Sequence, residues 1–452
     1  MLLKGKHILY TEIGENVETK LARIAEVARN KPNERFTSLI HLINYEMIVK
    51  CHHELDGNKA AGVDEVTKAE YEKNLPENVK DLIARMKRQA YKPQPAKRAY
   101  ISKENGKQRP LGIPAYEDKL VQKALAKILN AIYEEDFLEC SFGFRPKRSC
   151  HDALRVLGKI VNRNDINYVV DTDIKGFFDN VDHEWMMKFI DHRIKDPNMQ
   201  RLIMRFLRAG IMEAGIKYDT PQGTPQGGVC SPIMANLYLH HVVDLWFNRI
   251  IREELKGKAY MVRYADDIIF CLQYKEDVKR FYKALKERIA KFGLELSEEK
   301  TKIVKVSDKS DDDDDGNDTF DFLGFTHYMG KCKDGVKRLK RKTSNKRYYR
   351  SINRCKAWLK YNRTLPVKEL MGKLNRKLTG TFNYYAVSDN SKSINSLYHE
   401  VLKLVYKWLN RRSQKKSFDW DKFEIFLERY PVVKPRIKVN LYKLGAGASY
   451  VR

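Results

Sequence analysis

The segment Arg263-Tyr264-Ala265-Asp266-Asp267 places two adjacent acids between two apolar runs, residues 259–262 before them and residues 268–271 after them. Both runs are short and predict β-strands, with the acids at the tip of the hairpin that joins the strands. Two carboxylates at one turn, with no Lys or Arg directly after them, are typical of a site for a hard divalent cation. Asp is also common in surface turns, and this segment alone does not separate the two interpretations.

The positive charge of the chain is concentrated in one region. The 452 residues include 86 Lys and Arg against 59 Asp and Glu, a formal net charge of +27. Residues 331–416 hold 25 Lys and Arg and 4 Asp and Glu, so this region carries +21 and the other 366 residues carry +6. Such a concentrated field is typical of proteins that bind polyanions. A solvated basic surface without a partner is the alternative.

Length and composition predict a globular protein of two or three domains. None of the seven Cys lies in a C-x-x-C pair or a zinc-like spacing, which favours reduced, packed side chains in a reducing compartment. No run of 18 apolar residues occurs, and the apolar run at the N-terminus is too short for a signal peptide. We therefore expect a cytoplasmic protein with no membrane among its partners.

Two regions in the first third of the chain have clear local patterns. Apolar residues recur at helical spacing from Phe36 and stop near Gly57, and a second helical region is expected over residues 66–89. Residues 98–114 predict a β-hairpin with cations on both arms. Such a hairpin suits a triphosphate, because Lys offers a point charge and Arg a bidentate fork. A solvated basic hairpin is the alternative.

A predicted strand over residues 168–174 carries two further acids. Strand alternation puts Asp171 and Asp173 on the same face, so either could join the hairpin acids in one metal site. A helical stretch over about 184–210 follows, and then residues 224–232, whose glycines let the backbone approach a ligand closely. A helix over 233–247 leads to the acidic hairpin, and a strand is expected over 320–325.

The basic region predicts two long helices. One has an apolar face that leaves Lys373, Arg376 and Lys377 mostly off it, and the other spans about 393–412. Together they predict a helical bundle with one apolar and one cationic side. The five aspartates 311–315 repel one another and predict a solvated loop without a metal role.

The order of these features is typical of a nucleotidyl transferase, which holds two Mg²⁺ roughly 3.5–4 Å apart between acids. With this order of features, the chain resembles the bacterial group II intron reverse transcriptases/maturases from about residue 36 to 440. The most specific segments are residues 108–114, 141–149, 223–232, 263–267 and 322–325, with 372–378 and 383–385 in the basic region.

The resemblance implies an α+β fold of the right-hand polymerase type, with fingers, a palm built on an antiparallel sheet, and a helical thumb. The expected divisions are a helical N-terminal extension over residues 1–95 and fingers and palm over 96–330. A basic helical thumb/maturase domain follows over 331–435, and a C-terminal tail over 436–452.

The resemblance also implies the metal site. Asp173 matches the first catalytic acid of the family, because residues 174–179 follow it as the motif requires, and Asp171 becomes the second choice. Asp266 and Asp267 are the hairpin pair, and the backbone carbonyl of Ile174 is expected to complete a metal shell for two Mg²⁺ ions.

Five residues are expected to contact the incoming nucleotide by the same resemblance. Lys103 and Arg109 match the fingers residues on the triphosphate, and Gln226 matches the glutamine beside the nucleotide. Phe178 is expected under the sugar, where it excludes a 2′-hydroxyl. Lys300 is a candidate proton donor to the leaving pyrophosphate.

The implied function is RNA-directed DNA synthesis from dNTPs, an RNA template and a DNA primer, together with binding of the group II intron RNA to assist splicing and retrohoming. Lys373, Arg376 and Lys377 are the expected nucleic-acid contacts. A splicing-only maturase and a domesticated reverse transcriptase in phage defence or DNA repair are the alternatives.

Three departures from the family pattern stand out. Ser102 precedes the fingers lysine where Pro is common, and residues 221–223 duplicate part of the motif that follows them. No paired Cys or His-Asn-His-like stretch follows residue 420, so no endonuclease domain is expected in this sequence.

Overall fold

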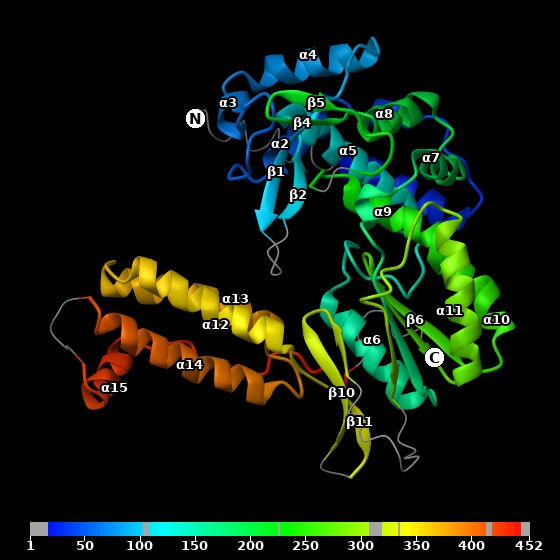
Figure 1. Ribbon diagram of the computed structural model, residues 1–452. Coiled ribbons are helices and arrows are strands. Elements are labelled where there is room, and N and C mark those ends of the chain that lie inside the picture. The colour runs from blue at the N-terminus through cyan, green and yellow to red at the C-terminus, as the bar shows by residue number, and fades with distance from the viewer. Residues whose placement is uncertain are drawn as a thin grey trace.

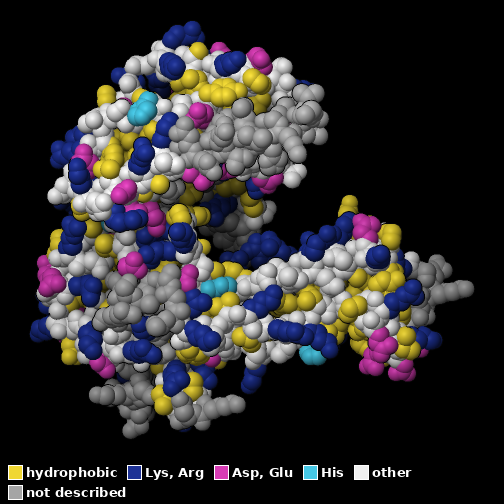
Figure 2. Space-filling model, turned by 180° about the vertical axis from the view of Figure 1, so that it is seen from behind, with side chains coloured by type: hydrophobic (Ala, Val, Ile, Leu, Met, Phe, Trp, Pro, Cys, Tyr) yellow, Lys and Arg dark blue, Asp and Glu magenta, His cyan; other side chains and the backbone are white. Residues whose placement is uncertain are grey.

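The computed structural model describes residues 17–102, 108–224, 227–306, 319–332, 335–412 and 418–443. Helices and small sheets form an upper body, a sheet-based lower body and a projecting helical arm, which surround an open cleft (Figure 1). The space-filling view from behind shows the same cleft as a deep notch between the upper body and the arm (Figure 2). The predicted α+β, right-hand arrangement of fingers, palm and thumb is confirmed.

Short capped helices form the N-terminal part of the upper body. A helix over residues 17–30 precedes α2 (Tyr45–Glu54), α3 (Lys68–Glu72) and α4 (Leu75–Lys87). The side chain of Asn44 accepts a hydrogen bond from the Met47 amide at 2.9 Å and so caps α2. The two helical regions expected before residue 90 are present, the second as two helices.

The fingers sheet has the strand order β2-β1-β4-β5. Its expected cationic hairpin is confirmed as β1 (Ala96–Ser102) and β2 (Gln108–Ile113), which pair antiparallel and project toward the cleft (Figure 1). Strand β4 (Ile211–Glu213) lies parallel to β1 and pairs with β5 (Ile216–Tyr218). The long α5 (Tyr116–Tyr133) follows this hairpin and packs in the main core against α2 and α9 (Ser231–Leu239).

One helical stretch was expected over residues 184–210, and this prediction is wrong in one respect. The chain forms two helices there, α7 (His183–Asp191) and α8 (Pro197–Leu207). The buried Asp196 starts the second one, because its carboxylate accepts from the amides of Asn198 and Met199. The same carboxylate accepts from the amides of Leu39 and Ile40, which fastens the N-terminal segment to α8.

The palm sheet is antiparallel throughout, with the order β6-β7-β3-β8. Its strands are β3 (Tyr168–Thr172), β6 (Ala259–Tyr264), β7 (Asp267–Leu272) and β8 (Lys302–Lys305). Helix α6 (Cys150–Arg163) covers one face, and α9 (Ser231–Leu239) and α11 (Lys275–Ala290) cover the other. After α9, the predicted helix continues through π-helical turns η3 (His240–Asp244) and η4 (Phe247–Ile251), and α10 (Arg252–Glu254) follows.

A three-stranded sheet joins palm and thumb. It contains β9 (Phe320–Phe322), β10 (Phe325–Lys331) and β11 (Lys337–Thr343). The single strand expected over residues 320–325 is wrong, because Leu323 and Gly324 have φ values of 50° and 80° and turn the chain. The expected boundary at residue 330 falls inside β10, so the helical thumb begins only at Asn345.

The thumb contains α12 (Asn345–Asn362), α13 (Val367–Tyr385), α14 (Ser391–Leu409) and α15 (Trp420–Arg429). Their apolar faces share a separate core, which confirms the predicted bundle. The segment expected to be a tail returns to the body, since Val439 bridges to Val387 and Leu441 is buried. Within the described ranges, every helix is too short or too polar to cross a bilayer.

Candidate active site

Strand pairing brings the predicted acids together. Strands β6 and β7 meet in a two-residue turn, in which Ala265 has a φ of 58° and Asp266 follows it. Thr172, the last residue of β3, pairs with Ile268 of β7. Asp173 therefore leaves the sheet beside Asp267, at the same end as Asp266 (the turn residue). The sequence predicted the hairpin and the strand, and their pairing makes them one site.

The carboxylates of this site repel one another. Partial desolvation by the protein, and then the charges of Asp266 and Asp173, raise the pKa of Asp267 to about 6, although the residue keeps a surface open to the cleft. Desolvation also raises the pKa of Asp266, with Asp173 adding to the rise and Arg109 opposing it. Each shift marks a carboxyl group whose charged form would be stabilised by a cation.

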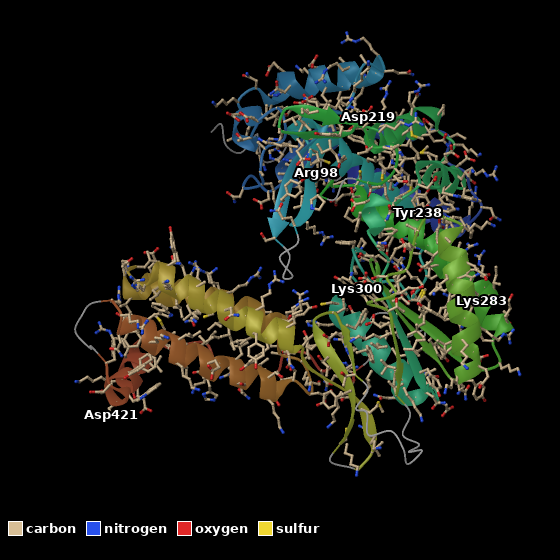
Figure 3. The ribbon with its side chains drawn as sticks, in the orientation of Figure 1. Arg98, Asp219, Tyr238, Lys283, Lys300 and Asp421 are labelled. Atoms are coloured by element: carbon tan, nitrogen blue, oxygen red, sulfur yellow. The ribbon has the colours of Figure 1, made fainter. Side chains whose placement is uncertain are left out.

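An ammonium group already lies among these acids. Lys300 Nζ donates to Asp173 Oδ2 at 2.6 Å, and Figure 3 shows Lys300 on the palm, near the inner end of the cleft. Among the described residues, no three acid, His or Cys side chains form a ready-made metal cage. The donor set is nevertheless one that hard divalent cations prefer, since it consists of carboxylate oxygens and a backbone carbonyl.

Asp171, the second choice, lies one step back within the sheet. It pairs with Ile269 and Lys302, and burial followed by the charge of Asp267 raises its pKa to about 7. The charges of Asp267 and Asp173 both raise the pKa of Asp171, and the charge of Asp173 raises the pKa of both hairpin acids. The choice of Asp173 as the third acid stays a prediction, supported by its position beside Asp267 where β3 ends.

The backbone hydrogen bonds after Asp173 pass over the Ile174 carbonyl. The Ser297 amide donates to the Asp173 carbonyl and the Lys175 amide donates to the Glu295 carbonyl, both at 2.8 Å. These bonds flank Ile174, whose own carbonyl accepts no hydrogen bond from any residue in the described ranges. This arrangement is compatible with the expected role of that carbonyl as a metal ligand.

The two phenylalanines that follow have different surroundings. Gly176 has a φ of 56° and starts the short 3₁₀ helix η2 (Phe177–Asp179). Phe177 is buried, whereas Phe178 is only partly buried. The Thr224 amide donates to the Phe178 carbonyl at 2.7 Å, so the glycine-rich loop lies directly on this turn.

The glycine-rich loop also reaches the fingers. A Cβ on Gly227 would lie 2.8 Å from the carbonyl oxygen of Gly112 in β2, and Gly227 has a φ of 110°. Only glycine fits such a contact without strain. Arg109 on the same strand is near enough to affect the pKa of Asp266. Lys103 and Gln226 lie outside the described residues, as do the aspartates 311–315.

A fully buried arginine supports the acidic hairpin, a role that sequence reasoning missed. Arg263 donates to both carboxylate oxygens of Asp244 at 2.8 and 2.6 Å, and both side chains are 0% exposed. Its third nitrogen donates to the side chain of Asn236 at 2.9 Å and to the Ala265 carbonyl at 3.1 Å. The arginine therefore holds the residue directly before Asp266.

The loop over residues 141–149 is part of the same support. The Phe142 amide donates to the Arg263 carbonyl at 2.8 Å, and the Asn236 side chain donates to the Gly143 carbonyl at 2.8 Å. A Cβ on Gly143 would lie 2.3 Å from the Ala265 nitrogen, so only glycine allows this approach.

Comparison with known proteins gives the same assignment. Residues 101–327 match the model of the reverse transcriptase (RNA-dependent DNA polymerase) family, and residues 350–426 match the group II intron maturase-specific domain. The protein YkfC of Escherichia coli K12 is 32% identical over 343 residues, which are 67% of this chain and 86% of YkfC. The chain belongs to the group II intron reverse transcriptase/maturase family.

Another relative is the group II intron-encoded protein LtrA of Lactococcus lactis, which is 40% identical over 224 residues. The matched region covers 49% of this chain and 37% of LtrA. This reverse transcriptase/maturase thus spans little more than a third of the length of LtrA.

In this reverse transcriptase/maturase, the three thumb residues predicted to bind nucleic acid differ in their contacts within the protein. Lys373 pairs with Glu369 at 2.6 Å on α13, and the Lys377 ammonium lies 5.3 Å from the centre of the Trp358 ring. Arg376 is exposed. All three lie off the apolar face of α13, as predicted, but the first is largely neutralised by its pair.

Helix α12 has a cationic groove that sequence reasoning missed. An open groove of about 500 Å³ is lined by Lys346, Tyr349, Arg350, Asn353, Arg354 and Ala357. These residues recur every three or four positions and so share one face of the helix. Lys and Arg side chains gather along the thumb edge that faces the cleft (Figure 2).

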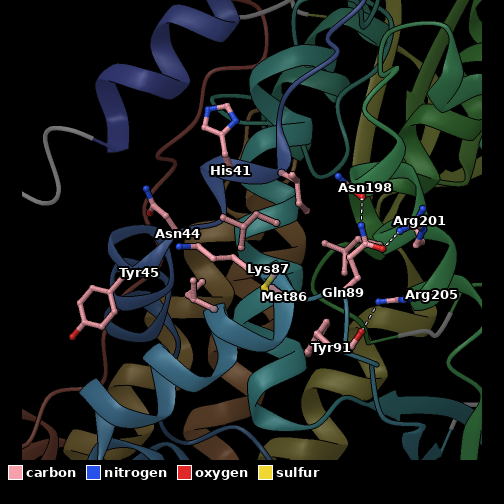
Figure 4. A pocket seen from close by; sticks show the side chains of 14 residues that line it. His41, Asn44, Tyr45, Met86, Lys87, Gln89, Tyr91, Asn198, Arg201 and Arg205 are labelled. Atoms are coloured by element: carbon pink, nitrogen blue, oxygen red, sulfur yellow. Dashed lines mark hydrogen bonds between the residues drawn. The ribbon is translucent and has the colours of Figure 1, made fainter.

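The upper body contains a cavity that is separate from the acids. It measures about 610 Å³ and lies between α2, α4 and α8 (Figure 4). Arg205 donates to the Tyr91 carbonyl, and Gln89 forms hydrogen bonds with Arg201 and Asn198. These polar residues of the cavity wall are therefore bonded to one another. None of the three palm acids lines it.

Proposed function

We propose that this protein is an RNA-directed DNA polymerase that works by two-metal nucleotidyl transfer. The observation that carries the proposal is the meeting of Asp173, Asp266 and Asp267 at one end of the palm sheet, beside Arg109 of the fingers. Two bound Mg²⁺ ions would lower the pKa of the primer 3′-hydroxyl and neutralise the triphosphate.

The side chains around the acids have separate tasks. Asp173, Asp266 and Asp267 hold the metal ions, and the Ile174 carbonyl adds a ligand. Arg109, with Lys103 on the same hairpin, binds the triphosphate. Lys300 can reach this site, because its ammonium already contacts Asp173, and it is positioned to donate a proton to the leaving pyrophosphate.

The sugar pocket is formed by the turn after Asp173. The partly buried Phe178 lies under the glycine-rich loop and is proposed to exclude a ribose 2′-hydroxyl. Gln226 is proposed to contact the nucleotide from that loop. RNA template and DNA primer would occupy the cleft between fingers and thumb.

The thumb extends this function to intron RNA. The net charge of +21 over residues 331–416, the cationic groove on α12 and the maturase-specific match support binding of a large folded RNA. We therefore propose assistance to intron splicing and retrohoming by a cytoplasmic protein. A splicing-only maturase is disfavoured because the palm acids and Arg109 are all present.

Primer extension tests the proposal. Purified protein, Mg²⁺ and dNTPs should extend a DNA primer on an RNA template, and the Asp266→Ala variant should not. Absence of extension by the wild type, with intron RNA still bound, would favour the splicing-only maturase. Flanking genomic DNA that does not fold as a group II ribozyme would favour the domesticated reverse transcriptase.

A further inference from the structure

A small cavity opens between two helices of the thumb. Its walls come from α12 and α13 and its floor from α14, and it measures about 230 Å³. Figure 1 shows α12 and α13 on the side of the thumb that faces the fingers and α14 on the far side. We call this cavity the thumb pocket, lined by Ser351, Arg354, Cys355, Trp358, Leu374, Lys377, Leu378, Thr381, Leu397 and Val401.

The thumb pocket combines an apolar interior with cations at its edge. Leu374, Leu378 and Val401 are buried and give it an apolar floor. The partly buried Trp358 offers an aromatic face, and the Lys377 ammonium lies 5.3 Å from the centre of its ring. Arg354 and Lys377 are both exposed. An aromatic face with adjacent cations is the usual means of holding a stacked base and its phosphate.

The hydroxyl groups of the pocket are oriented as acceptors. Ser351 Oγ donates to the Arg347 carbonyl at 2.9 Å, and Thr381 Oγ1 donates to the Lys377 carbonyl at 3.1 Å. Each hydroxyl donates its single proton to a carbonyl of its own helix, and its lone pairs can still accept a hydrogen bond. The ligand they suit therefore carries N–H donors, as nucleobases do.

The thumb pocket is continuous with the cationic groove of α12, because Arg354 lines both. Along that groove, Lys346, Arg350 and Arg354 follow one another at four-residue intervals, which is about 6 Å of helix rise. A row of cations that ends at an aromatic pocket fits a nucleic-acid strand whose backbone follows the helix. Cavities for drug-sized ligands measure roughly 300–1000 Å³, so this smaller one suits a single planar ring.

We propose that the thumb pocket receives one unpaired base of bound RNA while the α12 cations hold the backbone on either side. The base must be unpaired, because a stacked and paired base exposes neither face. This inference rests on the proposed RNA-binding function and adds a base-dependent contact to it. The surrounding charge of +21 favours RNA over a protein side chain as the occupant.

Binding of matched oligonucleotides tests the thumb pocket. A 12-nucleotide single-stranded RNA and an abasic strand of the same length have equal phosphates, so their difference in affinity reports base contacts. Stacking of one base contributes roughly 1–3 kcal/mol. Wild-type protein should therefore prefer the RNA by at least about fivefold.

Filling the pocket supplies the decisive variant. Thr381→Trp should lower the preference for RNA over the abasic strand several-fold while leaving the salt dependence unchanged, because the α12 cations remain. Thr379→Trp is the matched control, since this residue lies on the same helix outside the pocket, and it should keep the wild-type preference. Equal preference in all three proteins would overturn the inference.

Cross-linking provides a readout that does not depend on affinity. RNA carrying 4-thiouridine should cross-link to the peptide containing Cys355 and Trp358, and Thr381→Trp should remove that cross-link. Cross-links restricted to other parts of the protein would overturn the inference while leaving RNA binding intact. Failure of the wild type to bind either strand would instead contradict the proposed function.

Discussion

The palm and the thumb both depend on charge but use it in opposite ways. In the palm, Arg263 and Asp244 are 0% exposed and joined by two hydrogen bonds, and the pKa values of Asp266 and Asp267 are raised. In the thumb, the cations lie on exposed helix faces. Chemistry at one point requires fixed positions, which burial enforces at a cost in desolvation. Binding a long polyanion requires many cations, each of small effect.

One buried arginine connects the two regions. Arg341 of β11 is 0% exposed and donates to the Leu154 carbonyl of α6 at 2.9 Å. A Cβ on Gly158 of the same helix would lie 2.0 Å from the guanidinium. Asp389, between α13 and α14, lies 3.7 Å from another nitrogen of Arg341. The thumb is thus anchored on the helix that covers the palm sheet.

The largest expected effect comes from removing one palm acid. Asp173→Asn or Asp266→Asn should reduce primer extension by at least about a thousandfold, because each metal ion contributes several kcal/mol to the transition state. Affinity for intron RNA should stay within about twofold, since the binding cations lie elsewhere. Parallel extension and binding assays measure both.

Asp171→Asn is the matched control, because Asp171 lies on the same face of β3. It should retain extension within about tenfold of the wild type. An inactive Asp171→Asn beside an active Asp173→Asn would show that the strand acid was wrongly chosen.

The next effect tests whether fixed position matters in the palm. Arg263→Lys keeps the charge but loses the paired bonds to Asp244 and the bond to the Ala265 carbonyl. Disrupting a buried pair typically costs about 3–5 kcal/mol of stability. We expect a lower melting temperature and a reduction in kcat of roughly tenfold or more, with KM for dNTP little changed because the triphosphate contacts remain.

The exposed Arg249 on the adjacent π-helical segment provides the control for this change. Arg249→Lys should change neither kcat nor melting temperature. A wild-type kcat in a destabilised Arg263→Lys protein would show that the arginine only stabilises the fold.

In the thumb, the expected effects are smaller and distributed. Replacing Lys346, Arg350 and Arg354 by Ala should flatten the salt dependence of intron-RNA binding by about two to three phosphate contacts, at roughly 0.7–0.9 in log–log slope for each. The equivalent change of Lys373, Arg376 and Lys377 should remove fewer, because Lys373 pairs with Glu369. A salt series measures both slopes, and a larger loss from the α13 set would reverse the ranking of the two helices.

Prediction from the sequence succeeded where the signal was local. The acids, the alternation around them and the glycine positions all lie within short segments, so the two hairpins could be predicted, and the metal ligands stay a prediction. The partners of Arg263 could not be predicted in this way. Asp244 lies in the π-helical turn η3, and Asn236 lies in the preceding helix α9. Nothing in the spacing of these residues indicates that they meet.

Prediction of the RNA-binding face of the thumb failed for a different reason. Cations occur throughout residues 331–416, so composition predicted its function but could not rank α12 against α13. The helices had to be packed before their free faces were known. The turn at Leu323 and Gly324 was missed because Phe320, Phe322 and Phe325 lie close together and resemble one strand, which the pattern alone does not divide.

The smallest expected effect is a pH-dependent stabilisation by Mg²⁺, which should occur in the palm and not in the thumb. In the metal-free protein, Asp267 titrates at about 6 and Asp171 at about 7, whereas both would titrate near 3.8 when unfolded. The native state therefore binds more protons than the unfolded chain in this window, so these groups lower stability as pH rises from about 4 to 7. Mg²⁺ binds the ionised acids, and its stabilising effect should grow over the same window to roughly 2 °C in melting temperature.

Two variants make this measurement specific. Asp267→Asn should abolish the Mg²⁺ shift, while Asp171→Asn should keep it, because both remove a carboxylate of raised pKa but only the first removes a proposed ligand. The thumb provides the contrast, since Lys and Arg remain charged throughout this range and RNA affinity should vary little between pH 6 and 8. A Mg²⁺ shift that is independent of pH, or that persists in Asp267→Asn, would mean that the ion binds outside the palm acids.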